Sequence, residues 1–273
     1  MNKHVLVTGA AGRIGSYFAR NHGQNDYRLR LMVRGGEPGI DALRDFGEVV
    51  TCDLNDKDGL RHVTDGIDTV VHLAGNASAA AIWQDLLEAN IVGTYNLCAA
   101  AKSSGCRRIV FASSIHAVSG YPVDAQVKID EPVNPGDLYG VSKCFGEALC
   151  RYLAEQEGMS AIAIRIGAFQ SVERAGSERG LSMLDAFVSE RDLTQLLVRC
   201  IDAEDVRFAI VHGLSGNRFN RLDISDARTR FGYAPVDDST KIAPQLKDLN
   251  LSGKLQTHSL KDYPEKSGFR KDV

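Results

Sequence analysis

The segment His4-Val5-Leu6-Val7-Thr8-Gly9-Ala10-Ala11-Gly12-Arg13-Ile14-Gly15 decides the fold of this chain. Its apolar first part predicts a strand, and the glycines that follow permit a tight turn into a helix. They also let the backbone approach a pyrophosphate, which a helix N-terminus stabilises electrostatically. At the first strand–helix junction of a chain, this arrangement indicates dinucleotide binding rather than an ordinary Gly-rich turn. The residues expected to hold the cofactor here are Gly9, Gly12, Arg13, Ile14 and Gly15.

Strands and helices alternate through the rest of the sequence. Strands are predicted at residues 4–8, 29–33, 49–52, 69–73, 108–112, 161–166 and 208–211. Helices are predicted at residues 14–22, 57–63, 83–101, 139–157 and 190–200. Because several strands are apolar on both faces, as in a buried parallel sheet, we expect an α/β fold. We expect a doubly wound parallel sheet of the Rossmann type, with a small C-terminal substrate-capping region.

The chain shows no internal repeat or low-complexity linker, so residues 1–273 are expected to form one NAD(P)-binding Rossmann domain. Less regular stretches at about 168–188 and 212–273 are expected to cap the carboxyl ends of the strands. Open α/β sheets bind their ligands at those ends. Ser189 is predicted to cap the helix at 190–200, with Asp192 three residues further on.

Composition restricts the class of protein. The net charge of −3 gives no electrostatic case for nucleic acid or an anionic membrane as a partner. No apolar run is long enough to span a bilayer, and the first strand leaves no room for a signal peptide. The six scattered cysteines form no Cys-x-x-Cys pair, and no His/Cys/Asp cluster has metal-ligand spacing. We therefore expect no metal, and a cytoplasmic protein with buried free thiols.

The end of the second predicted strand indicates which dinucleotide is bound. An acidic residue there would bind the ribose 2′-hydroxyl and select NAD. The chain has Val33-Arg34-Gly35-Gly36 instead. Arg34 can pair with a 2′-phosphate, so NADP is favoured over NAD. The alternative is that Arg34 is an ordinary solvated loop residue.

Three further segments are expected to line the cofactor. Asp53 and Leu54 end the third strand, where such a pair flanks the adenine in similar folds, although a helix N-cap at Asp53 or Asn55 is the structural alternative. The backbone of the loop Leu73-Ala74-Gly75 follows the fourth strand. Asn90 lies within a predicted helix, where asparagine is unfavourable, and is expected to hydrogen-bond a neighbouring loop across the site.

Tyr139 and Lys143 lie four residues apart and therefore share one face of a predicted helix. Lowering the pKa of a phenol by roughly three units needs about 4 kcal/mol. A positive charge about 4 Å away supplies energy of that order. Ser113 and Ser114 follow a strand at its carboxyl end, where a hydroxyl can orient the oxygen of a substrate. For Tyr139 and Lys143, the alternative is an exposed pair on a surface helix. For the two serines, it is a polar strand terminus. His72, at the end of the fourth strand, is expected to be a packed structural histidine rather than a catalyst.

These residues resemble the extended short-chain dehydrogenase/reductase superfamily, also called the NAD-dependent epimerase/dehydratase family. The resemblance runs from about residue 3 to 235, and within the family the chain is most similar to the uronate dehydrogenases at 108–114, 138–147 and 165–167. It implies hydride transfer from the C1 hydroxyl of a pyranose, which yields a lactone. It also implies a catalytic triad of Ser114, Tyr139 and Lys143, and a homodimer formed through the helices at 83–101 and 139–157.

The resemblance implies a substrate site formed by Asn76, Ser78, Ser114, Ile115, His116, Tyr139 and Gly167. The chain departs from the family pattern at Ile115, which replaces an asparagine, and at Ser182, which replaces an arginine. It also lacks the long C-terminal lobe of nucleotide-sugar epimerases. A small free sugar or sugar acid is therefore the expected partner. An epimerase, dehydratase or carbonyl reductase of the same fold remains open, as does a nucleotide sensor without catalysis.

Overall fold

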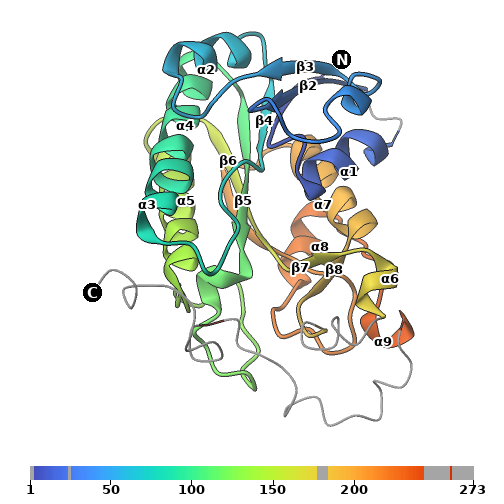
Figure 1. Cartoon of the computed structure of the whole chain (residues 1–273). Coiled ribbons are helices and arrows are strands. Elements are labelled where there is room, and N and C mark those ends of the chain that lie inside the picture. Colours follow the sequence, from blue (N-terminus) through green and yellow to red (C-terminus); the bar gives the residue numbers. More distant parts are fainter. Residues whose placement is uncertain (1–2, 24–25, 177–183, 243–258, 260–273) are drawn as a thin grey trace.

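A central parallel sheet organises the protein. The computed structural model describes residues 3–23, 26–176, 184–242 and 259. Within them, seven parallel strands pair in the order β3-β2-β1-β4-β5-β6-β9. Helices cover both faces of this sheet (Figure 1). The order reverses direction between β1 and β4, as in a doubly wound sheet, so the predicted fold class is confirmed.

All seven predicted strands are present, with ends that differ from the prediction by one or two residues. The strands are β1 Lys3–Thr8, β2 Tyr27–Val33, β3 Glu48–Thr51, β4 Thr69–His72, β5 Arg108–Ser114, β6 Ser160–Ile166 and β9 Phe208–Gly213. The longer β5 matters for the site, because Ser113 and Ser114 continue the ladder and pair with Arg165 and Ile166. The two serines therefore point to opposite sides of the sheet.

The main helices are α1 Arg13–Asn21, α2 Lys57–Thr64, α3 Trp83–Leu86, α4 Gly93–Ser103, α5 Leu138–Glu155, α7 Glu190–Asp202 and α8 Ser225–Phe231. The prediction of one regular helix at 83–101 was wrong in one respect. A π-helix, Leu87–Val92, joins α3 to α4. Such widened turns are rare and often lie at functional sites. The prediction also missed α8, and the single turns α6 Val172–Ala175 and α9 Ser239–Ile242, because short helices carry little apolar periodicity.

A second, two-stranded parallel sheet lies apart from the main one. It pairs β7 Ala168–Gln170 with β8 Phe187–Ser189, beyond the carboxyl ends of β5 and β6 (Figure 1). Strands of three residues are too short to show alternation, so this sheet was not predicted. Ser189 ends β8 and caps α7, since its hydroxyl accepts the Asp192 N–H at 3.2 Å as predicted. The C-terminal capping segment expected at 212–273 begins inside β9. Parts of the two expected capping segments lie outside the described residues, namely 177–183, 243–258 and 260–273.

Two apolar layers hold the helices to the sheet. On one face, Phe18 of α1 and Leu193 of α7 pack with Val5 of β1. On the other face, Leu60 of α2 and Leu97 of α4 pack with other residues of the sheet, including residues of β1. Alternate residues of β1 thus enter both layers, which explains why the strands read as continuous apolar runs.

A buried ion pair ties α5 to the sheet. Both guanidinium contacts from Arg165 of β6 to the Glu147 carboxylate measure 2.9 Å, and the two side chains are only 2% and 3% exposed. Ser113 also donates to this carboxylate at 2.6 Å. Because α5 carries Tyr139 and Lys143, the ion pair helps to fix the position of these two residues relative to the sheet.

All six cysteines are free, and five are buried. No helix in the described ranges combines the length and apolarity needed to cross a membrane. Nor do three His, Cys, Asp or Glu side chains gather there as a metal site would require.

The buried carboxyl of Asp185 should make the stability of the protein depend on pH. Both of its carboxyl oxygens are buried without a hydrogen bond, and burial raises the pKa of this carboxyl to about 6 although Arg221 opposes the shift. The folded protein therefore favours the protonated acid. This preference stabilises the fold below the ordinary pKa of 3.8 and is lost as pH rises through about 6. Asp185→Asn should stabilise the protein at pH 8 by up to about 3 kcal/mol and change little at pH 4.

Urea unfolding at both pH values measures this difference. The exposed Asp26→Asn variant, which lacks the burial, is the matched control and should leave the free energy of unfolding unchanged. A gain for Asp185→Asn that is equal at both pH values would show that the carboxyl does not titrate as described.

Candidate active site

A long cleft crosses the carboxyl edge of the sheet. Its larger part, of about 700 Å³, lies over β1 to β4. A second part, of about 410 Å³, continues toward β5 and α5. The two parts share lining residues from the glycine loop and from the loop after β4, which are Gly9, Gly12, Leu73, Gly75, Asn76 and Ala77. The predicted cofactor residues of both loops therefore meet in one place.

The glycine loop is shaped by close backbone contacts. Gly9 has φ +67°, and a Cβ there would lie 2.9 Å from the Ala74 backbone. A Cβ on Gly15 would lie 2.5 Å from the Gly9 carbonyl oxygen. Gly12 caps α1 and donates to the same carbonyl oxygen at 2.9 Å. The turn thus presents the N-terminus of α1 to the cleft without side chains in between, which fits the pyrophosphate of a dinucleotide.

Arg13 and Ile14 extend this loop toward the second part of the cleft. The Arg13 guanidinium donates to the Phe169 carbonyl oxygen at 2.9 Å and lies 5.5 Å from the centre of that ring. Phe169 belongs to β7. Arg13 therefore joins the cofactor loop to the small second sheet.

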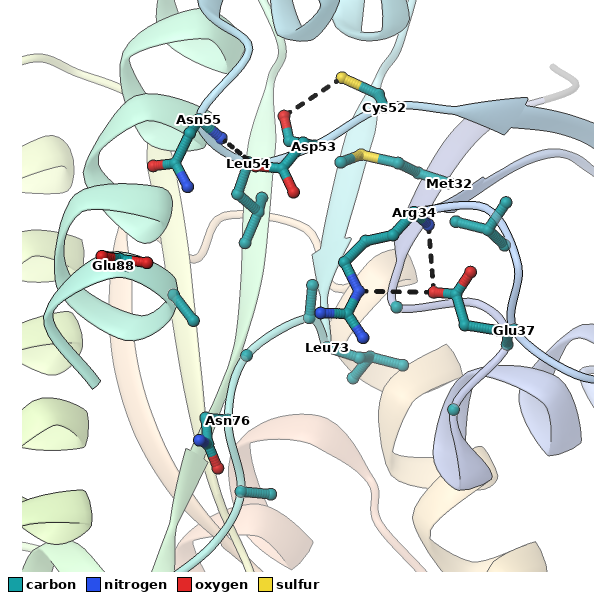
Figure 2. Close-up of a pocket in the computed structure, with 18 of the residues that line it drawn as sticks. Met32, Arg34, Glu37, Cys52, Asp53, Leu54, Asn55, Leu73, Asn76 and Glu88 are labelled. Carbon is teal, nitrogen blue, oxygen red and sulfur yellow. Dashed lines mark hydrogen bonds and ion pairs between the residues drawn. The ribbon is translucent and has the colours of Figure 1, made fainter. Parts of the chain in front are cut away.

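The end of the cleft beside β2 and β3, where the adenosine was expected, contains a charged pair (Figure 2). The Arg34 side chain is 77% exposed, and its Nε lies 3.7 Å from Oε1 of Glu37. The Arg34 backbone N–H donates to the same oxygen at 3.1 Å. Arg34 is thus a solvated residue whose positive charge is opposed by a neighbouring acid.

Asp53 and Leu54 line the same end of the cleft, as predicted for the adenine side. The Asp53 carboxylate accepts the Asn55 N–H at 2.8 Å, which closes a local turn. The helix N-cap predicted at Asp53 or Asn55 was wrong. Asp56 caps α2, accepting the Gly59 N–H at 2.9 Å, because the turn at Asp53 delays the start of the helix.

Asn90 holds the loop after β4 from within the π-helix. Its Oδ1 accepts the Asn76 N–H at 2.8 Å, and its amide donates to the Asn76 carbonyl and the Ser142 hydroxyl at 2.9 Å each. The expected bond to a neighbouring loop is confirmed. The Asn90 side chain is only 2% exposed, and in this structure its bonds support Asn76. Ser78 is exposed and donates its N–H to the Asn76 side chain at 3.0 Å.

His72 is a structural residue, as the sequence indicated. Its Nδ1 lies 2.8 Å from the Thr8 hydroxyl and its Nε2 lies 3.2 Å from the Thr94 hydroxyl. Burial lowers the pKa of His72 to about 3, with a further contribution from Lys143, so the ring is neutral at physiological pH. A neutral, doubly bonded imidazole below the loop 73–75 stabilises the loop rather than exchanging protons.

Ser114, Tyr139 and Lys143 converge in the second part of the cleft. Burial raises the pKa of Tyr139 to about 12, although a hydrogen bond with Ser114 opposes the shift. Burial lowers the pKa of Lys143 to about 8, and its Nζ donates to the Ala112 carbonyl at 2.9 Å. The expected lowering of the Tyr139 pKa by Lys143 is therefore not found in this structure. The ammonium faces a carbonyl, and desolvation of the phenol dominates.

His116 and Asp137 add a pair that the sequence analysis did not identify as a unit. His116 Nδ1 lies 2.7 Å from Oδ2 of Asp137, and Oδ1 of the same carboxylate accepts the Gly140 N–H at 2.7 Å. One buried carboxylate therefore caps α5 and orients His116, whose ring centre lies 5.2 Å from that of Tyr139. An aspartate two residues before the helix predicted at 139–157 is the signal that could have indicated this cap.

The predicted substrate residues that line this part of the cleft are Asn76, Ser114, Ile115, His116, Tyr139 and Gly167. Gly167 leads into β7, and a Cβ there would lie 2.2 Å from the Ala186 carbonyl oxygen. Ala168 and Phe169 complete the wall; they belong to the capping segment expected at 168–188 but were not named as substrate residues. The arrangement combines a phenol, a hydroxyl and an ammonium at one end of the cleft that begins at the glycine loop, which suits proton transfer coupled to hydride transfer.

Comparison with known proteins agrees with this geometry. The model of the NAD dependent epimerase/dehydratase family matches residues 5–198. A uronate dehydrogenase of Pseudomonas putida is 33% identical over 235 residues, which cover 86% of this chain and 84% of that protein. An L-arabinose 1-dehydrogenase (NAD(P)(+)) of Haloferax volcanii is 31% identical over 258 residues, covering 87% of this chain and 98% of that protein.

A solved structure shows the same similarity in three dimensions. A variant of uronate dehydrogenase from Agrobacterium tumefaciens complexed with NAD superposes with a TM-score of 0.76 at 32% identity. The match covers 90% of this chain and 89% of that one. The residues matched by the family model, 5–198, include the glycine loop and all three of Ser114, Tyr139 and Lys143.

Proposed function

The chain belongs to the NAD-dependent epimerase/dehydratase family, and from that premise we propose that it is an NAD(P)-dependent dehydrogenase of a free sugar or sugar acid. The reaction that we propose is oxidation of the C1 hydroxyl to a lactone. The observation that carries the proposal is the convergence of Ser114, Tyr139 and Lys143 at one end of the cleft that begins at the glycine loop. The substrates named for the relatives, a uronate and a pentose, share an oxidisable anomeric hydroxyl.

Ser114, Tyr139 and Lys143 each have a separate role in the proposed reaction. Ser114 holds the reacting oxygen by a hydrogen bond, beside the Tyr139 hydroxyl that it already contacts. Tyr139, as phenolate, takes the proton of the C1 hydroxyl while the carbonyl bond forms. A bound NAD or NADP supplies the nicotinamide ring that accepts the hydride from C1. Lys143 provides the positive charge that favours the phenolate once its ammonium turns from Ala112 toward the tyrosine.

A substrate screen tests the function. Aldoses, uronates and sulfo-sugars are each incubated with NAD and with NADP, and the absorbance of the reduced nicotinamide is followed. Stoichiometric cofactor reduction with formation of a lactone is the expected result. Conversion of a sugar into its epimer without net reduction would contradict the proposal and favour the epimerase alternative.

The cofactor choice rests on the adenosine end. We propose that the protein uses NADP in preference to NAD, because Arg34 reaches into the cleft and can pair with a 2′-phosphate. Among the relatives, one was solved with NAD, and another is named for both cofactors. Removal of the Arg34 charge should therefore affect NADP far more than NAD.

The surroundings of the site complete the proposal. We propose that the segments at 168–188 and 212–273 cap the sugar site, where Ala168 and Phe169 of the first segment line the cleft. We also propose a cytoplasmic location, because unpaired buried cysteines are typical of a reducing compartment. A small sugar, rather than a macromolecule, is the partner in this reading.

Ser114 and Ser113 should differ in their mutant effects. Ser114→Ala should lower kcat about 10–10²-fold, because it removes a hydrogen bond to the oxygen at which charge develops. Ser113→Ala should leave kcat near normal and lower stability instead, since the Ser113 hydroxyl donates to the buried Glu147 carboxylate. Steady-state kinetics and thermal unfolding of both variants measure this. Reversed effects would mean that Ser113, not Ser114, holds the substrate.

We propose that the protein forms a homodimer. Exposed apolar side chains on α3, the π-helix, α4 and α5 support this, and they are Trp83, Val92, Tyr95, Val141 and Tyr152. These helices lie together on one side of the sheet (Figure 1). Light scattering at micromolar concentration should give twice the monomer mass, and a Tyr95→Lys variant should shift it toward the monomer. A monomer mass for the unmodified protein would refute the proposal.

A further inference from the structure

Glu37 occupies a position that calls for a ligand. Its Oε1 accepts the Arg34 N–H, whereas its Oε2 is buried and makes no hydrogen bond. A buried carboxylate oxygen without a donor is unfavourable unless a ligand supplies one. Glu37 lines the adenosine part of the cleft, and its carboxylate faces the same space as the Arg34 guanidinium (Figure 2).

The loop geometry explains how an acid reaches this position four residues after β2. Gly35 and Gly36 adopt φ +94° and +79°, values that other residues rarely take. The chain therefore folds back, and Glu37 comes to lie beneath Arg34. A residue late in the loop is thus brought to the edge of the cleft beside the end of β2.

We propose that Glu37 binds the ribose 2′-hydroxyl of NAD and that the Arg34–Glu37 pair sets the selection between NAD and NADP. The inference rests on the proposed dinucleotide site and adds the residue that opposes Arg34. With NAD, the ribose hydroxyl donates to the carboxylate. With NADP, the 2′-phosphate gains Arg34 but meets the negative charge of Glu37, which also competes for the guanidinium.

Two other acids of this part of the cleft, Asp53 and Glu88, already have partners. Asp53 already closes the turn with the Asn55 N–H. Glu88 lies across the cleft and accepts from the Gln84 side-chain amide at 2.8 Å. Glu37 is the acid whose buried oxygen is without a partner and whose other oxygen is tied to Arg34.

Binding measurements on the unmodified full chain and three variants test the inference. Dissociation constants for NAD and NADP are measured by calorimetry, without any sugar. Glu37→Gln should weaken NAD about tenfold and tighten NADP severalfold, because it removes a charged acceptor and a competing negative charge. Arg34→Ala should weaken NADP about 10–10²-fold and leave NAD within about twofold. Glu88→Gln, which neutralises a paired acid of the same cleft, should change the NAD/NADP ratio little.

The opposite changes in NAD and NADP for Glu37→Gln are the signature of the inference. Equal weakening of both cofactors, or no change in either, would overturn it. Binding of 2′,5′-ADP should follow NADP in all variants if the effect lies at the ribose, and failure to do so would also count against it. If the cofactors bind as described but no sugar is oxidised, the proposed reaction is wrong while the assignment of Glu37 stands.

Discussion

Tyr139→Phe is expected to lower kcat about 10²–10⁴-fold, the usual range for loss of a general acid–base. The ring still fills its place beside His116, so the shape of the cleft is retained. Cofactor binding should persist, because the variant keeps the glycine loop and Lys143. Steady-state kinetics together with cofactor titration measure both quantities. Turnover within a few-fold of the unmodified enzyme would remove Tyr139 from its assigned role.

The pH dependence gives this prediction a second test. Burial raises the pKa of Tyr139 to about 12, so the phenol is protonated near neutral pH until Lys143 approaches it. Oxidation should therefore accelerate as pH rises toward about 8, where Lys143 begins to lose the charge that favours the phenolate, and reduction of the carbonyl should not. Tyr139→Phe should flatten the profile, whereas the exposed Tyr152→Phe should leave it unchanged.

Glu147→Ala is expected to destabilise the protein by about 3–5 kcal/mol. The substitution leaves Arg165 as a buried charge without its bidentate partner, and it also removes the acceptor of Ser113. Urea unfolding measures the loss. The exposed pair Arg207–Glu155 provides the control, because Glu155→Ala should cost at most about 1 kcal/mol.

A double variant separates the charge from the packing. Replacing Glu147 by leucine and Arg165 by methionine removes both charges and keeps the buried volume. It should recover much of the stability lost in Glu147→Ala, since the main penalty is the uncompensated charge. A loss as large as that of the single variant would show that the pair acts through its geometry instead.

The central sheet could be predicted because its signal is local. Each strand is a short run of apolar residues, and the glycine loop identifies β1 without knowledge of its neighbours. The pairing of β7 with β8 could not, since residues 168–170 and 187–189 are separated in sequence and three residues show no periodicity. The π-helix was missed for another reason. Apart from Asn90 its residues fit a regular α-helix, and the tertiary contacts of Asn90 accompany the wide turn.

Some features of the site could likewise be predicted from the sequence, and others could not. Tyr139 and Lys143 follow from helical spacing, and Ser114 from its place at the end of a strand. The direction of the Lys143 ammonium depends on the carbonyl of Ala112, thirty-one residues away, so its effect on the phenol was not predictable. The pairing of Arg34 with Glu37 depends on two residues of positive φ, which a strand-end rule does not consider.

The π-helix constrains the length of this part of the chain. A π turn contains more residues than the α-helical hydrogen-bond ladder requires, so Leu87–Val92 could lose one residue and still form a helix. The flanking helices would then keep their register, and only the residues of the widened turn, Asn90 among them, would change direction. Asn90 would point away from Asn76 and Ser142, and the loop beside the cofactor would lose its support. Single-residue deletions in this helix should therefore be rare among functional relatives, although helix propensity alone would permit them.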